Sequence, residues 1–271
     1  MHPDDKIPVS VIVATKNEER NITRCLTPLS VFSEVLVVDS QSTDRTKFLA
    51  TEQGARVIDF VWNGQYPKKR QWILDNINLQ HDWVFFVDAD ELVTPELIRE
   101  IQDAFNASVS CDGYFVRGLY VWQGQLLRHG LSNNKLCLFN RRKIEFPVVD
   151  DLGLPGMGEI EGHYQPVLKS NGRIGHLRQA VLHYAAEDKD AWLRRHERYA
   201  AWENGMNRRN AWPRDPDPQR QMMKQLFRNL PLRGAIAFVH SYVLKKGFLD
   251  GAAGFDFALS RYHYYRMISL Y

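Results

Sequence analysis

The amino-acid sequence predicts an α/β protein with a mostly parallel, Rossmann-like sheet and a helical, basic appendage at its C-terminal end. Short runs rich in Val, Ile and Phe alternate with amphipathic segments through the first hundred residues, as in a doubly wound parallel sheet. The composition is ordinary for a globular chain, with 44% hydrophobic and 25% charged residues. Residues 194–266 hold 14 Lys and Arg against 6 Asp and Glu, a net charge of +8, whereas the whole chain carries +3.

Four apolar runs predict the parallel strands of the sheet. In chain order they are VSVIVAT (9–15), EVLVVD (34–39), ARVIDF (55–60) and WVFFV (83–87). Each run is followed by a segment with helical spacing or helix-start residues, at 16–29, 40–54, 67–79 and 94–105. Gly54 closes the second of these helices, and Thr94 caps the fourth, with Pro95 at its first helical position.

The pattern changes after residue 112. Residues 113–122, 125–130 and 135–142 alternate or cluster like antiparallel strands, and residues 145–175 are rich in Gly and Pro. That second stretch is longer than an ordinary connection, so it predicts a functional loop. A helix is expected over 187–205, ending at Gly205, and amphipathic helices over 220–246, broken near Pro231 and stopped at Gly247. We therefore expect one domain over residues 1–205 and an appendage over 206–271.

Polar and acidic residues follow three of the predicted strands. They are the run Thr15 to Glu18, then Asp39, and then Asp88 and Asp90 in VFFVDADE. The carboxyl ends of parallel strands meet at one edge of a sheet, which is where ligands bind in open α/β folds. Carboxylates there need a compensating cation, basic side chains or water. A nucleotide-sugar site needs such a set, because it must hold a base, a ribose and a metal-bound diphosphate.

Three motifs in this order carry a family resemblance. VSVIVATKNEERNI, EVLVVDSQSTDRT and VFFVDADE resemble the N-terminal half of the family 2 glycosyltransferases, which have the GT-A fold. The resemblance is close over residues 8–105. Residues 157–203, with EIEGHYQP and LHY, resemble more loosely the bacterial transferases of lipopolysaccharide-core and polysaccharide synthesis. The chain departs from many members at Ala14-Thr15-Lys16 and at Ser40-Gln41.

The resemblance implies a role for each strand end. Asp39 would meet the nucleobase, and Thr15, Asn17 and Glu18 would line the nucleotide pocket. Asp88 and Asp90 would form the DxD pair that holds Mg²⁺ or Mn²⁺, with Asp90 as the principal ligand and Asp88 also facing the nucleotide sugar. From the residues themselves, Lys69, within the run from Lys68 to Arg70, can reach the diphosphate.

Inverting transfer also needs a general base for the acceptor hydroxyl. The loop over 145–175 offers four acids, namely Asp150, Asp151, Glu159 and Glu161. In the resembling transferases a loop acid does this work, which implies Glu161 first and Asp151 second. His163, His176, His183 and His196 are spaced like no compact metal motif, so we expect them to pack or to contact the acceptor.

Each of these assignments has a plainer alternative. Asp39 and Asp44 can simply cap the following helix, and Asp88 or Glu91 can belong to the start of the helix near Thr94. The run from Lys68 to Arg70 can be a solvated helix start. Glu161 can be a glutamate that faces solvent.

The predicted activity is transfer of a hexose, most simply glucose from UDP-glucose, with inversion onto a lipid-linked saccharide. Two other function classes stay open. A haloacid-dehalogenase phosphatase also has a strand that ends in Asp-x-Asp, although Leu92 stands where that motif has Thr or Val. A non-catalytic, membrane-docked binding module would explain the basic C-terminal part but would leave the DxD pair without a role.

The C-terminal part predicts a peripheral membrane protein. In residues 220–271, Met222, Met223, Leu226, Phe227 and Leu230 share one helical face, and a second apolar group ends at Lys245-Lys246. Apolar residues flanked by basic ones are typical of an interfacial helix. The alternative is that this face packs inside the protein. Three widely spaced cysteines favour a reducing compartment. We expect a cytoplasmic location on the inner membrane face, an anionic membrane as a partner and no nucleic-acid partner.

Overall fold

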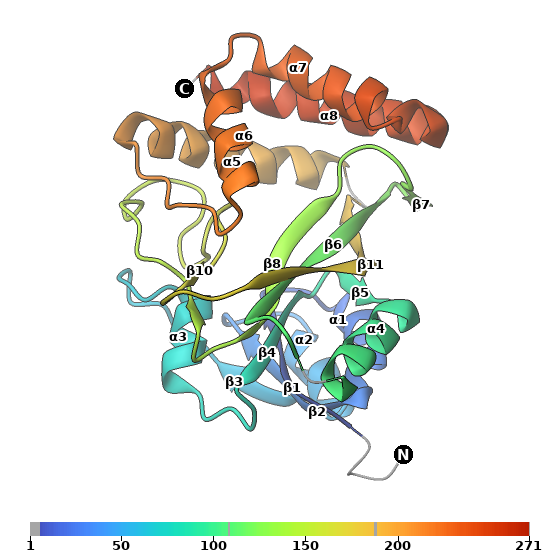
Figure 1. The fold of residues 1–271 in the computed structure, drawn as a ribbon, viewed down its shortest axis with the longest axis vertical. Coiled ribbons are helices and arrows are strands. Elements are labelled where there is room, and N and C mark those ends of the chain that lie inside the picture. Colours follow the sequence, from blue (N-terminus) through green and yellow to red (C-terminus); the bar gives the residue numbers. More distant parts are fainter. Residues whose placement is uncertain (1–5, 108, 187–188, 271) are drawn as a thin grey trace. The chain divides into compact units, whose positions relative to one another are not determined.

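The structure, a computed structural model, describes residues 6–107, 109–186 and 189–270. Figure 1 shows its ribbon. The contacts divide the chain into two compact units. Unit 1 consists of Met1–Gly118, Asn134–Phe146 and Pro166–His183. Unit 2 consists of Leu119–Asn133, Pro147–Gln165 and Tyr184–Tyr271.

The first half of unit 1 is a parallel sheet, and all four predicted strands are confirmed. They are β1 (Ile7–Thr15), β2 (Phe32–Asp39), β3 (Arg56–Asp59) and β4 (Trp83–Asp88). Strand β1 pairs in parallel with β2 and with β4, and β2 pairs in parallel with β3. The register sets Thr15 beside Asp39 and Ala14 beside Asp88. The predicted polar strand ends therefore meet at one edge.

Antiparallel strands extend this sheet in the order β3-β2-β1-β4-β8-β6-β11-β5. Among them, β6 (Gly113–Trp122) and β8 (Asn133–Asn140) confirm two predicted strands. The predicted strand over 125–130 is wrong in extent, because only β7 (Gln125–Leu126) pairs with β6. The prediction missed β5 (Glu91–Val93) and β11 (Ile174–Ala186), and two short strands, β9 (Ile144–Glu145) and β10 (Val167–Leu168), form a separate ladder.

Helices of unit 1 follow the parallel strands as predicted. They are α1 (Ile22–Leu26), continued by a 3₁₀ turn over Thr27–Val31, then α2 (Thr46–Glu52), α3 (Lys69–Asn76) and α4 (Pro95–Asn106). The Thr94 side chain caps α4 by accepting a hydrogen bond from the Leu97 N–H at 3.2 Å, which confirms that prediction. Gly54 follows α2 with φ +77°, a left-handed conformation that suits glycine at a helix end.

Unit 2 is mainly helical. It contains α5 (Lys189–Arg209), α6 (Pro218–Asn229), α7 (Arg233–Val239) and α8 (Gly251–Ile268). A π turn over His240–Leu244 extends α7, and a 3₁₀ turn over Gly247–Asp250 leads into α8, which lies alongside α7 (Figure 1). The break near Pro231 and the stop at Gly247 are confirmed. No helix among the described residues is both long and apolar enough to cross a membrane.

The predicted end of a helix at Gly205 is wrong, because α5 continues to Arg209. A Cβ at Gly205 would lie 2.6 Å from Leu154 Cδ2, so this glycine allows a close side-chain contact instead of ending the helix. We keep the division near residue 205 as a proposal about domains. The compact unit that contains residues 206–271 also takes in α5.

The three cysteines are free. Cys25 and Cys137 are buried, and Cys111 is half-buried. Burial raises the pKa of the Cys137 thiol to about 12.

Candidate active site

Thr15 and Asp39 form a buried pair at the ends of β1 and β2. The Thr15 hydroxyl donates to Asp39 Oδ2 at 2.9 Å, and the Asp39 side chain is wholly buried. Asp39 also accepts hydrogen bonds from the N–H of Ser42 at 2.7 Å and from its hydroxyl at 2.5 Å. These donors fix the carboxylate. Asp39 does not cap α2, because Asp44 accepts from the first N–H of that helix, at Thr46.

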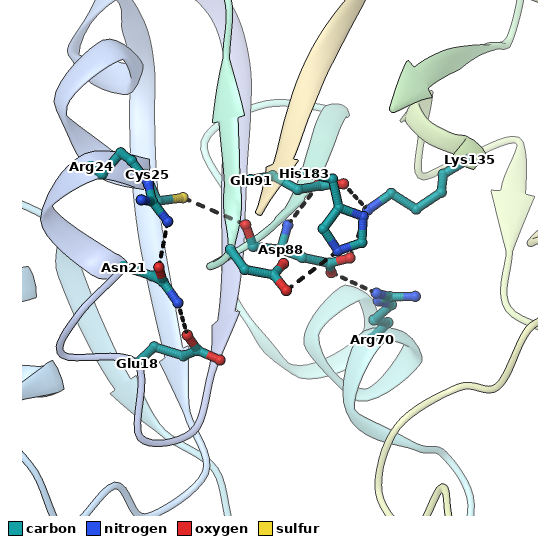
Figure 2. Close-up of polar contacts among 10 residues, drawn as sticks. Glu18, Asn21, Arg24, Cys25, Arg70, Asp88, Glu91, Lys135 and His183 are labelled. Atoms are coloured by element: carbon teal, nitrogen blue, oxygen red, sulfur yellow. Dashed lines mark hydrogen bonds and ion pairs between the residues drawn. The ribbon is translucent and has the colours of Figure 1, made fainter. Parts of the chain in front are cut away.

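The loop after β1 is tied to the loop after β2. Asn17, in a left-handed conformation with φ +57°, donates its N–H to Ser42 Oγ at 2.7 Å and accepts from the Thr43 N–H at 2.8 Å. The N–H of Glu18 donates to Thr46 Oγ1 at 2.7 Å. The Glu18 carboxylate accepts from the Asn21 side chain at 2.8 Å (Figure 2). The predicted nucleotide-pocket residues therefore belong to one hydrogen-bonded edge.

Lys69 is a buried side chain at the start of α3, not part of a solvated helix start. Its Nζ donates to Thr15 O at 3.1 Å and to Ser40 Oγ at 2.7 Å. It also lies 5.8 Å from the centre of the Phe60 ring. The ammonium therefore ties together the ends of β1 and β2 by hydrogen bonds.

Asp88 lies among basic side chains that come from two other elements. Arg70 of α3 contacts its Oδ1 at 2.9 Å, and Lys135 of β8 contacts its Oδ2 at 2.6 Å. The same lysine contacts Glu91 at 2.6 Å, and Figure 2 shows these side chains converging. Glu91 Oε2 accepts from the Asp88 N–H at 3.1 Å. Neither acid caps α4, because Thr94 does. Arg70 and Lys135 compensate the charge of Asp88 at the end of β4.

The charges of this cluster depend on one another. Burial alone would raise the pKa of the Asp88 carboxyl, but Lys135 and Arg70 outweigh it and hold that pKa well below its usual range. Burial raises the pKa of Glu91, and Asp88 adds to the rise, while Lys135 opposes it. Burial would lower the pKa of Lys135, but Asp88 and Glu91 outweigh it and raise it. Asp88 and Lys135 are therefore charged at neutral pH.

The thiol of Cys25 packs under the same cluster. Its Sγ donates to Asp88 O at 3.7 Å. Burial raises the pKa of this thiol well above its usual value, and the nearby acids Glu91, Asp90 and Asp88 raise it further. A buried neutral thiol is a poor nucleophile, so Cys25 packs rather than reacts.

Asp90 meets His183, one of the four histidines that the sequence analysis expected to pack or to contact the acceptor. The His183 Nε2 lies 3.3 Å from Asp90 Oδ2. Strand β11 brings it there, because its register with β5 sets His183 beside Glu91. Burial would lower the pKa of His183, but Asp90 outweighs it and raises it. The signal in the sequence was a polar residue within the run QAVLHY (179–184), which is readable once residues 174–186 are taken as a strand.

The Asp90 and His183 side chains fit a divalent cation. A carboxylate oxygen and an imidazole nitrogen are common ligands, and two ligands of one ion lie about 3 Å apart. Both oxygens of Asp88 contact Arg70 and Lys135, so Asp88 reaches an ion only if one ion pair opens. The described residues contain no group of three or more His, Cys, Asp or Glu arranged to hold a metal.

Asp151 and Glu161, the predicted bases, lie in unit 2. They are 2% and 3% exposed, so neither is the solvent-facing carboxylate of the plainer alternative. Trp202 of α5 contacts both segments. Its Nε1 donates to Asp151 Oδ2 at 3.1 Å, and a Cβ at Gly162 would lie 2.2 Å from Trp202 Cη2. The indole therefore orders the loop that carries both acids.

Comparison with known proteins agrees with this arrangement. The sequence profile described as glycosyl transferase family 2 matches residues 10–153. An uncharacterized glycosyltransferase of Rickettsia bellii is 37% identical over 107 residues, covering 39% of this chain and 35% of the relative. The lipopolysaccharide core biosynthesis glycosyltransferase LpsC of Rhizobium meliloti is 24% identical over 203 residues, covering 72% of this chain and 70% of that protein.

Among solved structures, glucosyl-3-phosphoglycerate synthase of Mycobacterium tuberculosis aligns with 42% of this chain and 44% of its own, at 25% identity and a TM-score of 0.33. This chain spans about a third to a half of the length of the rickettsial relatives that it matches. The family match covers more than half of the chain and includes all three motifs. It confirms the resemblance and the predicted α/β, GT-A fold. The chain therefore belongs to glycosyltransferase family 2.

Proposed function

We propose that this glycosyltransferase moves a hexose, most simply glucose from UDP-glucose, with inversion onto a lipid-linked saccharide in lipopolysaccharide or polysaccharide biosynthesis. The binding of a nucleotide-sugar donor rests on one observation. Asp90 pairs with His183, next to Asp88, whose carboxylate forms ion pairs with Arg70 and Lys135. The acceptor half is supported by the similarity to LpsC. The family assignment favours transfer over the phosphatase and the non-catalytic module.

In this proposal the ends of β1 and β2 bind the nucleoside. Asp39 accepts a hydrogen bond from the base, and Thr15, Asn17 and Glu18 line the pocket. Their hydrogen bonds to Ser42, Thr43 and Thr46 hold the two loops ready before the donor arrives. Lys69 holds these strand ends in place, since its ammonium donates hydrogen bonds to Thr15 O and Ser40 Oγ.

Asp90 and His183 would hold Mg²⁺ or Mn²⁺. Bound there, the cation supplies neutralisation of the charge that develops on the departing diphosphate. Arg70 and Lys135 keep Asp88 ionised and fixed at the end of β4. Asp88 then faces the nucleotide sugar as an oriented acceptor, and it becomes a further metal ligand if an ion pair opens.

Glu161 is the proposed base, with Asp151 as the alternative. The acceptor oxygen forms a bond to the anomeric carbon while the bond from that carbon to the diphosphate oxygen breaks. The hydroxyl proton passes to the Glu161 carboxylate. Burial of Glu161 limits its hydration, which favours a base over a spectator carboxylate.

The test is release of UDP from UDP-glucose with Mn²⁺. Asp90→Asn should keep the fold and lose activity by several orders of magnitude, and His183→Ala should act in the same direction. Asp82→Asn, at a half-exposed acid paired with Arg142, is the control. Full activity of Asp90→Asn at saturating Mn²⁺ would remove the metal assignment. Hydrolysis of an aryl phosphate with no preference for nucleotide sugars would favour the phosphatase.

A further inference from the structure

Exposed apolar side chains gather on one part of unit 2. Of the 18 large apolar residues that are exposed in the described chain, 12 lie between Met222 and Phe255. The densest run is the turn between α7 and α8, which we call the hairpin tip. It consists of Val243, Leu244, Lys245, Lys246, Phe248 and Leu249, and all six are exposed. Four of these residues are apolar and two are lysines.

The hairpin of α7 and α8 closes mainly through its backbone and through aromatic side chains. A Cβ at Gly234 would lie 2.7 Å from Tyr262 O, and a Cβ at Gly254 would lie 2.0 Å from Gly247 O, so the two segments touch through their backbones. Phe238 and Phe255 pack with ring centres 5.8 Å apart. Among the tip residues, Phe248 packs on Tyr242 with ring centres 6.3 Å apart, yet it remains 48% exposed.

An apolar groove lies on the same hairpin. It has a volume of about 290 Å³ and is lined by Ala235, Phe238, Val239, Phe255, Leu259 and Tyr262. Val239 and Phe255 are 47% and 45% exposed. The groove and the tip are therefore two exposed apolar features of the same hairpin.

The charge of this surface has one sign. Residues 230–271 contain two acids, Asp250 and Asp256. Both accept hydrogen bonds from the segment over residues 122–129, which includes β7. Asp250 accepts from the backbone N–H groups of Arg128 and His129 at 3.1 and 2.8 Å. Asp256 accepts from Trp122 Nε1 at 2.8 Å. The tip itself presents only Lys245 and Lys246 as charged groups.

Other basic residues of the C-terminal part are engaged within unit 2. Lys224 contacts Asp215 at 2.7 Å, Arg228 lies 3.8 Å from the centre of the Trp212 ring, and Arg233 contacts Glu203 at 2.6 Å. These side chains and the two tip lysines all belong to the basic region 194–266. The structure separates them and leaves the two tip lysines facing solvent.

We propose that the hairpin tip and its groove dock on a bilayer of anionic phospholipids. Val243, Leu244, Phe248 and Leu249 enter the interface, and Lys245 and Lys246 meet the headgroup phosphates. Apolar insertion assisted by lysines is how interfacial segments bind, and each lysine near an anionic surface adds about fivefold in affinity. This inference deepens the proposed function, since a lipid-linked acceptor lies at such a surface.

The test is co-sedimentation of the full chain with phosphatidylcholine vesicles, with and without phosphatidylglycerol. No donor or acceptor is present, so failure here leaves the proposed transfer untouched. Binding should require phosphatidylglycerol and fall with salt. Lys245→Gln/Lys246→Gln should weaken it by about tenfold or more, and Leu244→Ser/Leu249→Ser should abolish it. Lys6→Gln/Lys143→Gln, at two exposed lysines of unit 1, is the matched control and should bind like the wild type.

Equal recovery in the supernatant with and without anionic vesicles at low salt would overturn the proposal. So would equal binding by the wild type and both tip variants. Light scattering measures the oligomeric state. If the wild type is a dimer and Leu244→Ser/Leu249→Ser dissociates it, the tip contacts a second copy of the chain and the membrane proposal is overturned. The lysine variant changes only exposed side chains, so it keeps the proposal testable if the apolar variant fails to fold.

Discussion

Lys135 contacts two carboxylates at once, Asp88 and Glu91, each at 2.6 Å. Such a lysine does more than add one ion pair, because without it the buried Glu91 and the partly exposed Asp88 would face each other with only Arg70 and His183 to compensate them. Buried ion pairs contribute little net stability when intact, but losing one partner is costly. The arrangement therefore makes the end of β4 depend on a residue from β8.

Replacing Lys135 tests this dependence. Lys135→Met should lower the free energy of unfolding by about 3 kcal/mol at neutral pH, the low end for a buried pair, because it leaves the buried Glu91 and the partly exposed Asp88 without their shared cation. Adding Glu91→Gln should restore part of the loss. Urea unfolding followed by tryptophan fluorescence measures both changes. Lys169→Met, at a lysine 39% exposed and 3.8 Å from Glu145, is the control and should change little. A loss in Lys135→Met no larger than in that control would contradict the argument.

The two loop acids can be separated by their kinetics. Glu161→Gln should lower turnover by about 10²–10⁴, because the acceptor proton loses its base, while the KM for the donor stays close to the wild-type value. Asp151→Asn should keep turnover within about tenfold, since its carboxylate accepts from Trp202 and holds the loop. An active Glu161→Gln together with an inactive Asp151→Asn would transfer the role to Asp151.

At the scale of elements, α5 carries a titratable group inside an aromatic cluster. His196 stacks on Trp192 with ring centres 3.6 Å apart, and its Nδ1 lies 2.8 Å from Trp192 O. Burial lowers the pKa of His196 to about 3, and Arg261 and Arg195 also oppose its charge, while the Trp192 carbonyl favours it. The neutral ring is therefore the form that packs.

This gives a pH dependence of known sign. The folded pKa lies below the unfolded value of about 6.5, so the unfolded chain binds the proton more readily. Stability is full above pH 6.5 and declines as pH falls toward 3. The loss from this group at pH 5 should be about 1–2 kcal/mol. His196→Gln should flatten that part of the pH profile in thermal melts, whereas His263→Gln, at an exposed histidine of α8, should not. Identical profiles for the wild type and His196→Gln would refute it.

The elements also show what the sequence could predict. Runs such as VSVIVAT and VFFVD are buried on both faces, so their strands and polar ends could be read directly. Strand β11 could not, because Gly175, His176, Arg178 and Gln179 interrupt its apolar alternation and its partner β5 is only three residues long. Helix α8 was missed because apolar residues occur around its whole circumference, with no polar face to mark a period.

The same limit applies to the site. Asp88 and Asp90 could be found, since they end an apolar run. Their partners Lys135 and His183 could not, because each lies on an antiparallel strand whose place in the sheet depends on long-range pairing. The prediction of a helix end at Gly205 was wrong for a related reason. That glycine allows a close contact with Leu154, which is distant in the sequence, and does not end the helix.

For the whole molecule, the proposed roles divide between the two units. The residues assigned to the donor and metal, from Thr15 to His183, belong to unit 1, whereas Asp151, Glu161 and the hairpin tip belong to unit 2. Donor binding and catalysis can therefore be perturbed separately by substitutions in different units.

Ligand stabilisation measures that separation. UDP-glucose with Mn²⁺, at about a hundred times the dissociation constant, should stabilise the wild type by about 2.7 kcal/mol, seen as a rise in Tm. Glu161→Gln should keep this rise, and Asp90→Asn should lose most of it. ADP-glucose serves as the control nucleotide sugar. A larger shift with ADP-glucose than with UDP-glucose would contradict the choice of donor, and an equal shift in Asp90→Asn would contradict the role of that residue.

The burial of two cysteines has a practical consequence for such measurements. Cys25 and Cys137 are buried with raised pKa values, whereas Cys111 is accessible in part. A maleimide dye reacts with exposed thiolate, so brief labelling of the native chain should modify Cys111 alone. The natural sequence thus provides one attachment point for a fluorophore in unit 1, without any cysteine having to be introduced or removed. Energy transfer from that dye to labelled vesicles could then follow docking in real time.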